Sequence, residues 1–299
     1  MPSSPMSPTN AAGEEYRYEK FSWPEHNDLV EADKTVVVPV ACIEDHGRHL
    51  PIDVDVECVS TVCEEAVQSR SDALLFPTVK NGYDPHHMHM PGSINQNRES
   101  FLGKCIDIGI SLTHHGYERV LFVNGHGSNT HLLNQVQRQV NLQRPEARAA
   151  TVTWWELQEV VDLMSDIGEG GPSGSSHAGE TETSVYLYLH PDDVDMDEAV
   201  REIPYEDFPK HFARGWWAGD HPEASTRVTM MEYWSKFTES GVSGDATVAT
   251  AEKGEQIVEA AVAGLNSVLD EFAELPDMEP TDHHVVERTD RDYEPFRPG

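Results

Sequence analysis

The chain has 299 residues, of which 38% are hydrophobic, and 53 acidic against 21 basic side chains give a formal net charge of -32. Such an acidic surface repels nucleic acids and anionic membranes, and no apolar run approaches the roughly 18 residues that would cross a bilayer. We therefore expect a cytoplasmic protein with a buried core, without nucleic-acid or membrane partners. The acids are spread over the whole chain. This pattern is typical of the high-salt cytoplasm of halophilic archaea, and an ordinary acidic protein is the alternative.

The middle of the chain alternates strand-like and helix-like segments. Residues 1–15 are expected to form a disordered tail, 16–275 one domain, and 276–299 an acidic disordered tail. Apolar runs rich in β-branched residues predict strands at 35–43, 73–79, 119–125 and 148–157. Apolar residues three and four positions apart predict helices at 56–70, 98–116, 129–143 and 253–273. This order predicts a three-layer α/β/α domain with a mainly parallel sheet.

Four cysteines lie among apolar residues without C-x-x-C spacing: Cys42, Cys58, Cys63 and Cys105. Buried free thiols in a reducing compartment explain them, with a cysteine nucleophile or a zinc knuckle as the alternative.

Three polar clusters follow predicted strands or open a predicted helix. They are Glu44, His46 and Asp55; Asn124, His126 and Asn129; and His177, Glu180 and Glu182. Ligands of parallel sheets bind beyond the carboxyl ends of the strands, so these clusters can converge in space. Imidazoles and carboxylates are ligands for Zn²⁺, Mn²⁺ or Fe²⁺, and Asp55 could bridge two ions about 3.5–4 Å apart. A solvated loop is the alternative for the first cluster.

Glu182 falls on the apolar stripe of a helix expected to start near Ala178. Val185 and Leu189 share that stripe, so the Glu182 carboxylate needs a metal ion or a buried arginine as its partner. The Glu180 side chain lies about 160° from Glu182 around the same helix, so we expect it either behind the metal ligands or exposed to solvent. His177 precedes the helix and could transfer a proton, although single histidines often cap helices or fill cores.

Five stretches in order, "IEDHGRHLPIDVD", "MPGSI", "VNGHGSN", "HAGETETS" and "SGVSGDATVATAEKG", resemble the creatininase family of metal-dependent amide hydrolases. The resemblance runs from about residue 36 to 262 and implies the family's fold and two divalent ions per subunit, Zn, Mn or Fe. It implies one metal on Glu44, Asp55 and His126, and a second on His46, Asp55 and one further carboxylate. Ser128 stands where the creatinine-hydrolysing members have that carboxylate, and Glu182 is our candidate to replace it.

The resemblance also implies His177 as the catalytic histidine and Trp154 as a substrate-side residue, although a tryptophan in a strand-like segment often belongs to the core. His49, Ser128 and Glu180 complete the substrate-binding residues that we predict. The loop before His177, "GGPSGSS", lacks the tryptophan that the creatinine enzyme has there.

We expect hydrolysis of a non-peptide C–N bond, in an amide or cyclic amide, by a hydroxide that bridges the metals. One alternative is the archaeal formamide deformylase of flavin and deazaflavin biosynthesis, whose phosphorylated pyrimidine requires a phosphate site. Arg48 and Arg98 are the only basic residues near the motifs. The alternative from another class is a non-catalytic metal-binding scaffold subunit. The resemblance further implies a homo-oligomer, often a hexamer.

Overall fold

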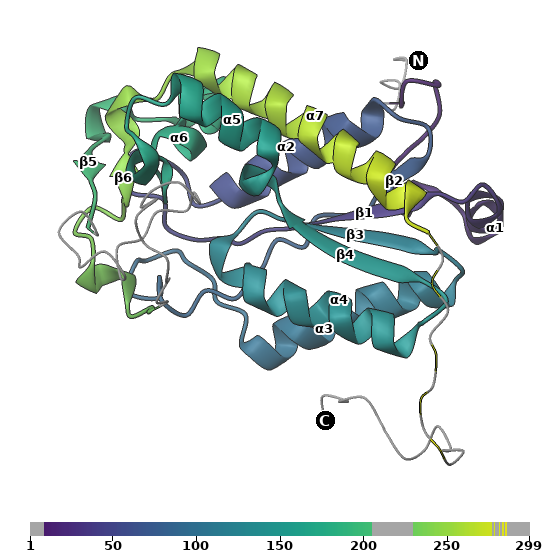
Figure 1. Ribbon diagram of the computed structural model, residues 1–299. Coiled ribbons are helices and arrows are strands. Elements are labelled where there is room, and N and C mark those ends of the chain that lie inside the picture. Colours follow the sequence, from purple (N-terminus) through teal and green to yellow (C-terminus); the bar gives the residue numbers. More distant parts are fainter. Residues whose placement is uncertain are drawn as a thin grey trace, which may run out of the picture.

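A four-stranded parallel sheet forms the centre of the molecule (Figure 1). The computed structural model describes residues 9–204 and 230–276 and the isolated positions 278, 281, 283 and 285. The strands lie in the order β2-β1-β3-β4, and every neighbouring pair is parallel. Their bounds are β1 Thr35–Val40, β2 Ala73–Leu75, β3 Arg119–Asn124 and β4 Arg148–Thr153. A separate antiparallel pair joins β5 Arg201–Glu202 to β6 Gly244–Asp245.

Helices cover both faces of the sheet (Figure 1). One layer holds α2 Val54–Gln68, α5 Gln158–Ile167, α6 Glu180–Leu189 and α7 Ala251–Glu274. The opposite layer holds α3 Arg98–His114 and α4 Thr130–Gln143, while α1 Trp23–Glu31 lies beyond the end of the sheet. The predicted single α/β domain with three layers is therefore confirmed. No helix in the described part of the chain is long and apolar enough to span a membrane.

Strand β1 shows why the sheet is buried on both faces. Val36, Val38 and Val40 pack into the core beneath α3 and α4, whereas Val37 points into the core beneath α2 and α7. All four valines are fully buried. Each such side chain contributes roughly 1.5–3 kcal/mol of hydrophobic free energy, so this strand anchors both layers.

The connections that leave β1 and β3 run to opposite faces of the sheet. The chain passes from β1 into α2 in one layer and from the neighbouring β3 into α4 in the other (Figure 1). This divergence creates a crevice at the carboxyl ends of the two strands, which is where open α/β sheets bind their ligands.

Several elements differ from the predictions. Helices α1 and α5 were not predicted, and β2 is shorter than the run at 73–79. Helix α6 begins at Glu180, because Ala178 has a φ of 51°, outside the helical region.

The expected N-terminal tail also differs, because it does not extend through residue 15. The backbone amide of Ala11 donates to the Gln68 carbonyl at 2.6 Å, and Asn10 is buried. Residues 1–8, and nearly all of the tail expected at 276–299, lie outside the described residues.

Candidate metal centre

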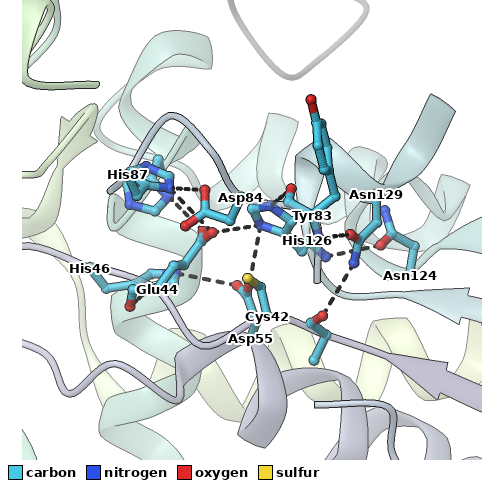
Figure 2. Close-up of polar contacts among 12 residues, drawn as sticks. Cys42, Glu44, His46, Asp55, Tyr83, Asp84, His87, Asn124, His126 and Asn129 are labelled. Carbon is cyan, nitrogen blue, oxygen red and sulfur yellow. Dashed lines mark hydrogen bonds and ion pairs between the residues drawn. The ribbon is translucent and has the colours of Figure 1, made fainter. Parts of the chain in front are cut away.

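Two buried carboxylates occupy the crevice between β1 and β3 (Figure 2). Glu44 follows β1, and Asp55 lies in the first turn of α2. His126 follows β3, and its Nδ1 lies 2.8 Å from Glu44 Oε2. The first two polar clusters predicted from the sequence therefore meet at the same edge of the sheet.

The two oxygens of Asp55 face different histidines. Oδ1 lies 3.3 Å from His46 Nε2, and Oδ2 lies 3.2 Å from His126 Nδ1. A carboxylate placed in this way can bind two cations at once, one beside each imidazole. The bridging role of Asp55 stays a prediction that this arrangement supports.

Backbone carbonyls fix which ring nitrogen of each of these histidines is free. His46 Nδ1–H donates to the Glu44 carbonyl at 3.2 Å, and His126 Nε2–H donates to the Tyr83 carbonyl at 3.2 Å. The other ring nitrogens, Nε2 of His46 and Nδ1 of His126, face Asp55, where each could hold a proton or a metal ion. Histidines that ligate metals are typically held by such a bond from the other ring nitrogen.

Several buried atoms of this cluster lack a hydrogen-bond partner: Glu44 Oε2, His46 Nε2 and Asp55 Oδ2. Burial opposes charge on His46, but Asp55, Glu182 and Glu44 raise its pKa to about 10. The pKa of Glu44 falls well below its ordinary value, because His126 and His87 outweigh the effect of burial. Buried carboxylates that draw protons onto the neighbouring imidazoles demand positive charge, which divalent cations could supply in place of those protons.

Glu182 brings a further carboxylate to His46. Its Oε2 lies 3.7 Å from His46 Nε2 and accepts the Ala178 amide at 2.6 Å. The side chain is 13% exposed, and burial, together with Asp55, raises its pKa to about 7. The helix begins later than predicted, yet this carboxylate does reach the cluster, where it could complete the second metal site.

His177 lies beside His46 and Glu44, two of the residues predicted to bind metal. Its Nε2–H donates to the Asp45 carbonyl at 2.7 Å, and its Nδ1 lies 3.6 Å from Glu44 Oε1. An isolated bridge to Ser243 holds its backbone. Burial, and then the charges of His46 and His87, lower its pKa well below the ordinary value. A neutral imidazole with a free Nδ1 facing the carboxylates can accept a proton there.

A fourth group of polar residues, which was not predicted from the sequence, lies on the loop between β2 and α3. His87 Nδ1 lies 2.6 Å from Asp84 Oδ1 and 3.3 Å from Glu44 Oε2. His86 Nδ1 lies 3.2 Å from the same Asp84 oxygen. Burial opposes charge on His87, but Glu44 and Asp84 raise its pKa to about 9. The available signal was the density of histidines in "DPHHMH", just before the quoted "MPGSI".

The structure also places the residues predicted to bind substrate. His49 is buried, with Nε2 2.9 Å from the Thr183 hydroxyl, and Trp154 packs in the core with 1% exposure. Ser128 lies in the short turn after His126, partly exposed. Their substrate contacts remain predictions.

Glu180 lies away from the cluster, in a different network. It is completely buried, and its carboxylate accepts Lys253 Nζ at 2.6 Å and the amides of Glu169 and Gly170. The expectation that it might face solvent was wrong, because Lys253 supplies a buried cation. These contacts give Glu180 a structural role and do not support the predicted role in substrate binding.

Two asparagines of "VNGHGSN" hold the loops around the centre. Asn124 Oδ1 accepts the His126 amide, and Asn129 bonds to both the Ala41 carbonyl and the Tyr83 amide (Figure 2). Gly125 allows the end of β3 to approach α2, since a Cβ there would lie 2.7 Å from Val59. The motif thus positions His126 and the carbonyl that orients it.

A family model described as "Creatininase: Creatinine amidohydrolase" matches residues 19–269. The chain belongs to the creatininase family. Creatinine amidohydrolase of Pseudomonas putida is 28% identical over 275 residues, covering 85% of this chain and 96% of that protein. A mycofactocin precursor peptide peptidase of Mycolicibacterium smegmatis is 31% identical over 236 residues, covering 77% and 81%. A 3-dehydro-scyllo-inosose hydrolase of Thermotoga maritima is 25% identical over 254 residues, covering 80% and 78%.

Solved creatininase structures share the fold. A manganese creatininase has a TM-score of 0.72 and 25% identity, covering 86% of this chain and 98% of its own. A zinc-zinc form of a creatininase mutant has a TM-score of 0.70 and 25% identity, with the same coverage. The chain is therefore a creatininase-family amidohydrolase with candidate metal-binding clusters, and its structural neighbours carry manganese or zinc.

Proposed function

We propose that this protein is a binuclear metal-dependent amidohydrolase that cleaves a non-peptide C–N bond of a small amide or cyclic amide. The observation that carries the proposal is the geometry of Asp55, whose two oxygens face the free nitrogens of His46 and His126 separately. One ion would lie on Glu44, Asp55 and His126. The other would lie on His46, Asp55 and Glu182.

Bound divalent ions would polarise the substrate carbonyl and make water nucleophilic near neutral pH. The chain itself supplies proton transfer. Because the Asp45 carbonyl holds Nε2–H of His177, Nδ1 is the atom that can take a proton from water and return it to the leaving nitrogen. A pKa well below the ordinary value keeps this imidazole neutral near pH 7. The native ions, zinc, manganese or iron, are part of the proposal.

The deformylase alternative finds little support among the described residues. Its substrate needs a cation or a helix N-terminus for the phosphate. Arg98 is exposed and pairs with Glu99 at 2.6 Å, and Arg48 is exposed as well. Neither arginine supplies the built phosphate site that this substrate requires.

A substrate panel tests the proposal directly. Protein loaded with Mn²⁺ or Zn²⁺ would be assayed at high salt with creatinine, a formylamino-pyrimidine phosphate, small N-formyl amides and short peptides. We expect turnover of a small non-peptide amide. In His177→Asn, both ions should remain by elemental analysis while kcat falls by about 10²–10⁴-fold, the usual contribution of acid-base catalysis.

Other results would redirect the proposal. Turnover of the phosphorylated pyrimidine alone would favour the deformylase, and turnover of peptides alone would place the chain with the peptidases. Bound metal without any turnover would favour the scaffold subunit. Metal loss in His177→Asn would show that this imidazole is a ligand.

We further propose, from the family resemblance, a homo-oligomer, often a hexamer in this family. From composition we propose a high-salt cytoplasm as its setting, and from the sequence one catalytic domain over 16–275. Analytical ultracentrifugation in high salt would test the assembly.

A further inference from the structure

Glu44 has a neighbour that the proposed ligand sets leave out. The ring of His87 directs one nitrogen at two carboxylates, with Nδ1 2.6 Å from Asp84 Oδ1 and 3.3 Å from Glu44 Oε2 (Figure 2). Asp84 is 0% exposed and His87 is 2% exposed. One imidazole nitrogen shared by two carboxylates is therefore buried beside the metal-facing groups.

We propose that Asp84 and His87 form a positioning pair that sets the orientation of the Glu44 carboxylate for metal binding. The inference rests on the proposed function, since it assumes that Glu44 is a metal ligand. His87 would act through Glu44 and would not itself bind the ion.

The short bond to Asp84 places the ring hydrogen of His87 on Nδ1, so Nδ1 holds carboxylates and does not bind a metal, while the buried Nε2 has no hydrogen-bond partner. A nitrogen that donates its hydrogen to a carboxylate has no lone pair to offer a metal. The same nitrogen lies 3.3 Å from Glu44 Oε2, an ion-pair contact that can restrain that oxygen. Hydrogen bonds to ligating carboxylates commonly change metal affinity or activity by about 10–100-fold.

Packing holds the pair in place. Trp234 lies edge-on to His87, with ring centroids 4.9 Å apart at 72°, and it is 4% exposed. Its backbone amide donates to the His86 carbonyl at 2.9 Å, and its indole N–H donates to the Gly241 carbonyl at 2.8 Å. Asn95 accepts the Asp84 amide at 2.9 Å. The loop therefore cannot swing its imidazole outward without breaking several contacts.

Chelator competition with Mn²⁺ or Zn²⁺ on the metal-free full chain tests the inference. In His87→Ala, we expect the affinity of one site to fall about 10–100-fold, with two ions still bound at saturation. His87→Asn should recover part of the loss, because its amide nitrogen reaches the position of Nδ1. The matched control is His89→Ala, on the same loop, where an exposed histidine bonds to Ser235 and touches neither carboxylate. It should bind both ions as the wild type does.

Three results would overturn the inference. They are unchanged affinity in His87→Ala, loss of a whole metal equivalent in that variant, and an equal loss in His89→Ala. Should His87→Ala fail to fold, Asp84→Asn carries the test, with the same expected loss. Because no substrate is used, the inference can fail while the proposed amidohydrolase stands. A wild-type chain that binds no metal would instead overturn the metal centre itself.

Discussion

Three imidazoles at the centre owe their orientation to the main chain. His46, His126 and His177 each donate one ring N–H to a backbone carbonyl, so each presents its other nitrogen to the carboxylates. A carbonyl does not titrate, which means that the free nitrogen stays the same when nearby acids gain or lose protons. Metal binding at His46 and His126 and proton transfer at His177 can therefore operate in the same cluster without exchanging roles.

Glu182 is the carboxylate that we propose for the second ion because Ser128 cannot supply one, so its removal is informative. Glu182→Gln keeps the shape but removes the negative charge 3.7 Å from His46 Nε2. We expect elemental analysis to show about one ion per chain instead of two, because a neutral amide is a poor ligand for these cations.

A matched control for this substitution is Glu57→Gln, since Glu57 lies two positions from Asp55 but pairs with His190 at the surface. It should keep both ions. Two full equivalents in Glu182→Gln would mean that another group completes the second site.

The sequence predicted the meeting of Glu44, Asp55 and His126 because each follows a recognisable strand or opens a recognisable helix. It could not place His87, because the loop between β2 and α3 has no periodicity that fixes where its side chains point. Glu180 was misjudged for a related reason. Its partner, Lys253, lies 73 residues away, and no local pattern reveals a distant ion pair.

At the scale of elements, the ion pair of Glu180 and Lys253 fastens α6 to α7 and to the glycine loop before His177. Lys253 Nζ also bonds to Glu169 and to the Val248 carbonyl. Lys253→Met should lower the free energy of unfolding by about 3–5 kcal/mol, because it leaves a buried carboxylate without its cation. Urea unfolding would measure the change.

Lys236→Met is the comparison for that measurement, since Lys236 pairs with Glu232 on an exposed surface. It should cost less than about 1 kcal/mol. Equal effects of the two substitutions would show that the buried pair contributes nothing special.

Elements with strong patterns were predicted within a few residues, as β1, β3 and α4 show. Helix α1 was missed, although Ser22 and Glu25 form a capping box with a proline in the first turn. Helix α1 has no buried residue, so its sequence carries only a weak apolar pattern. The capping box was the only sequence signal for this helix, and a search for apolar periodicity does not detect it.

At the scale of the whole molecule, charge dominates. A net charge of -32 favours expansion at low salt, because like charges repel over the Debye length. That length falls from about 10 Å at 0.1 M salt to about 3 Å at 1 M. We expect Tm to rise steadily as KCl increases across this range, measured by calorimetry on the metal-loaded protein.

Sucrose at matched osmolality serves as the uncharged comparison, because it strengthens burial without screening charge. A larger rise in KCl than in sucrose is the expected result. A Tm that stays constant or falls in KCl would contradict salt adaptation.

The centre is assembled from two kinds of chain segment. Its carboxylates and imidazoles stand at strand ends and at the start of helices, whereas Trp234 and Gly241 arrive late in the chain and close over them. The covering segment could therefore be exchanged while the ligands beneath it stay in place. A chimaera that exchanges only the covering segment between family members is the natural route to a new specificity.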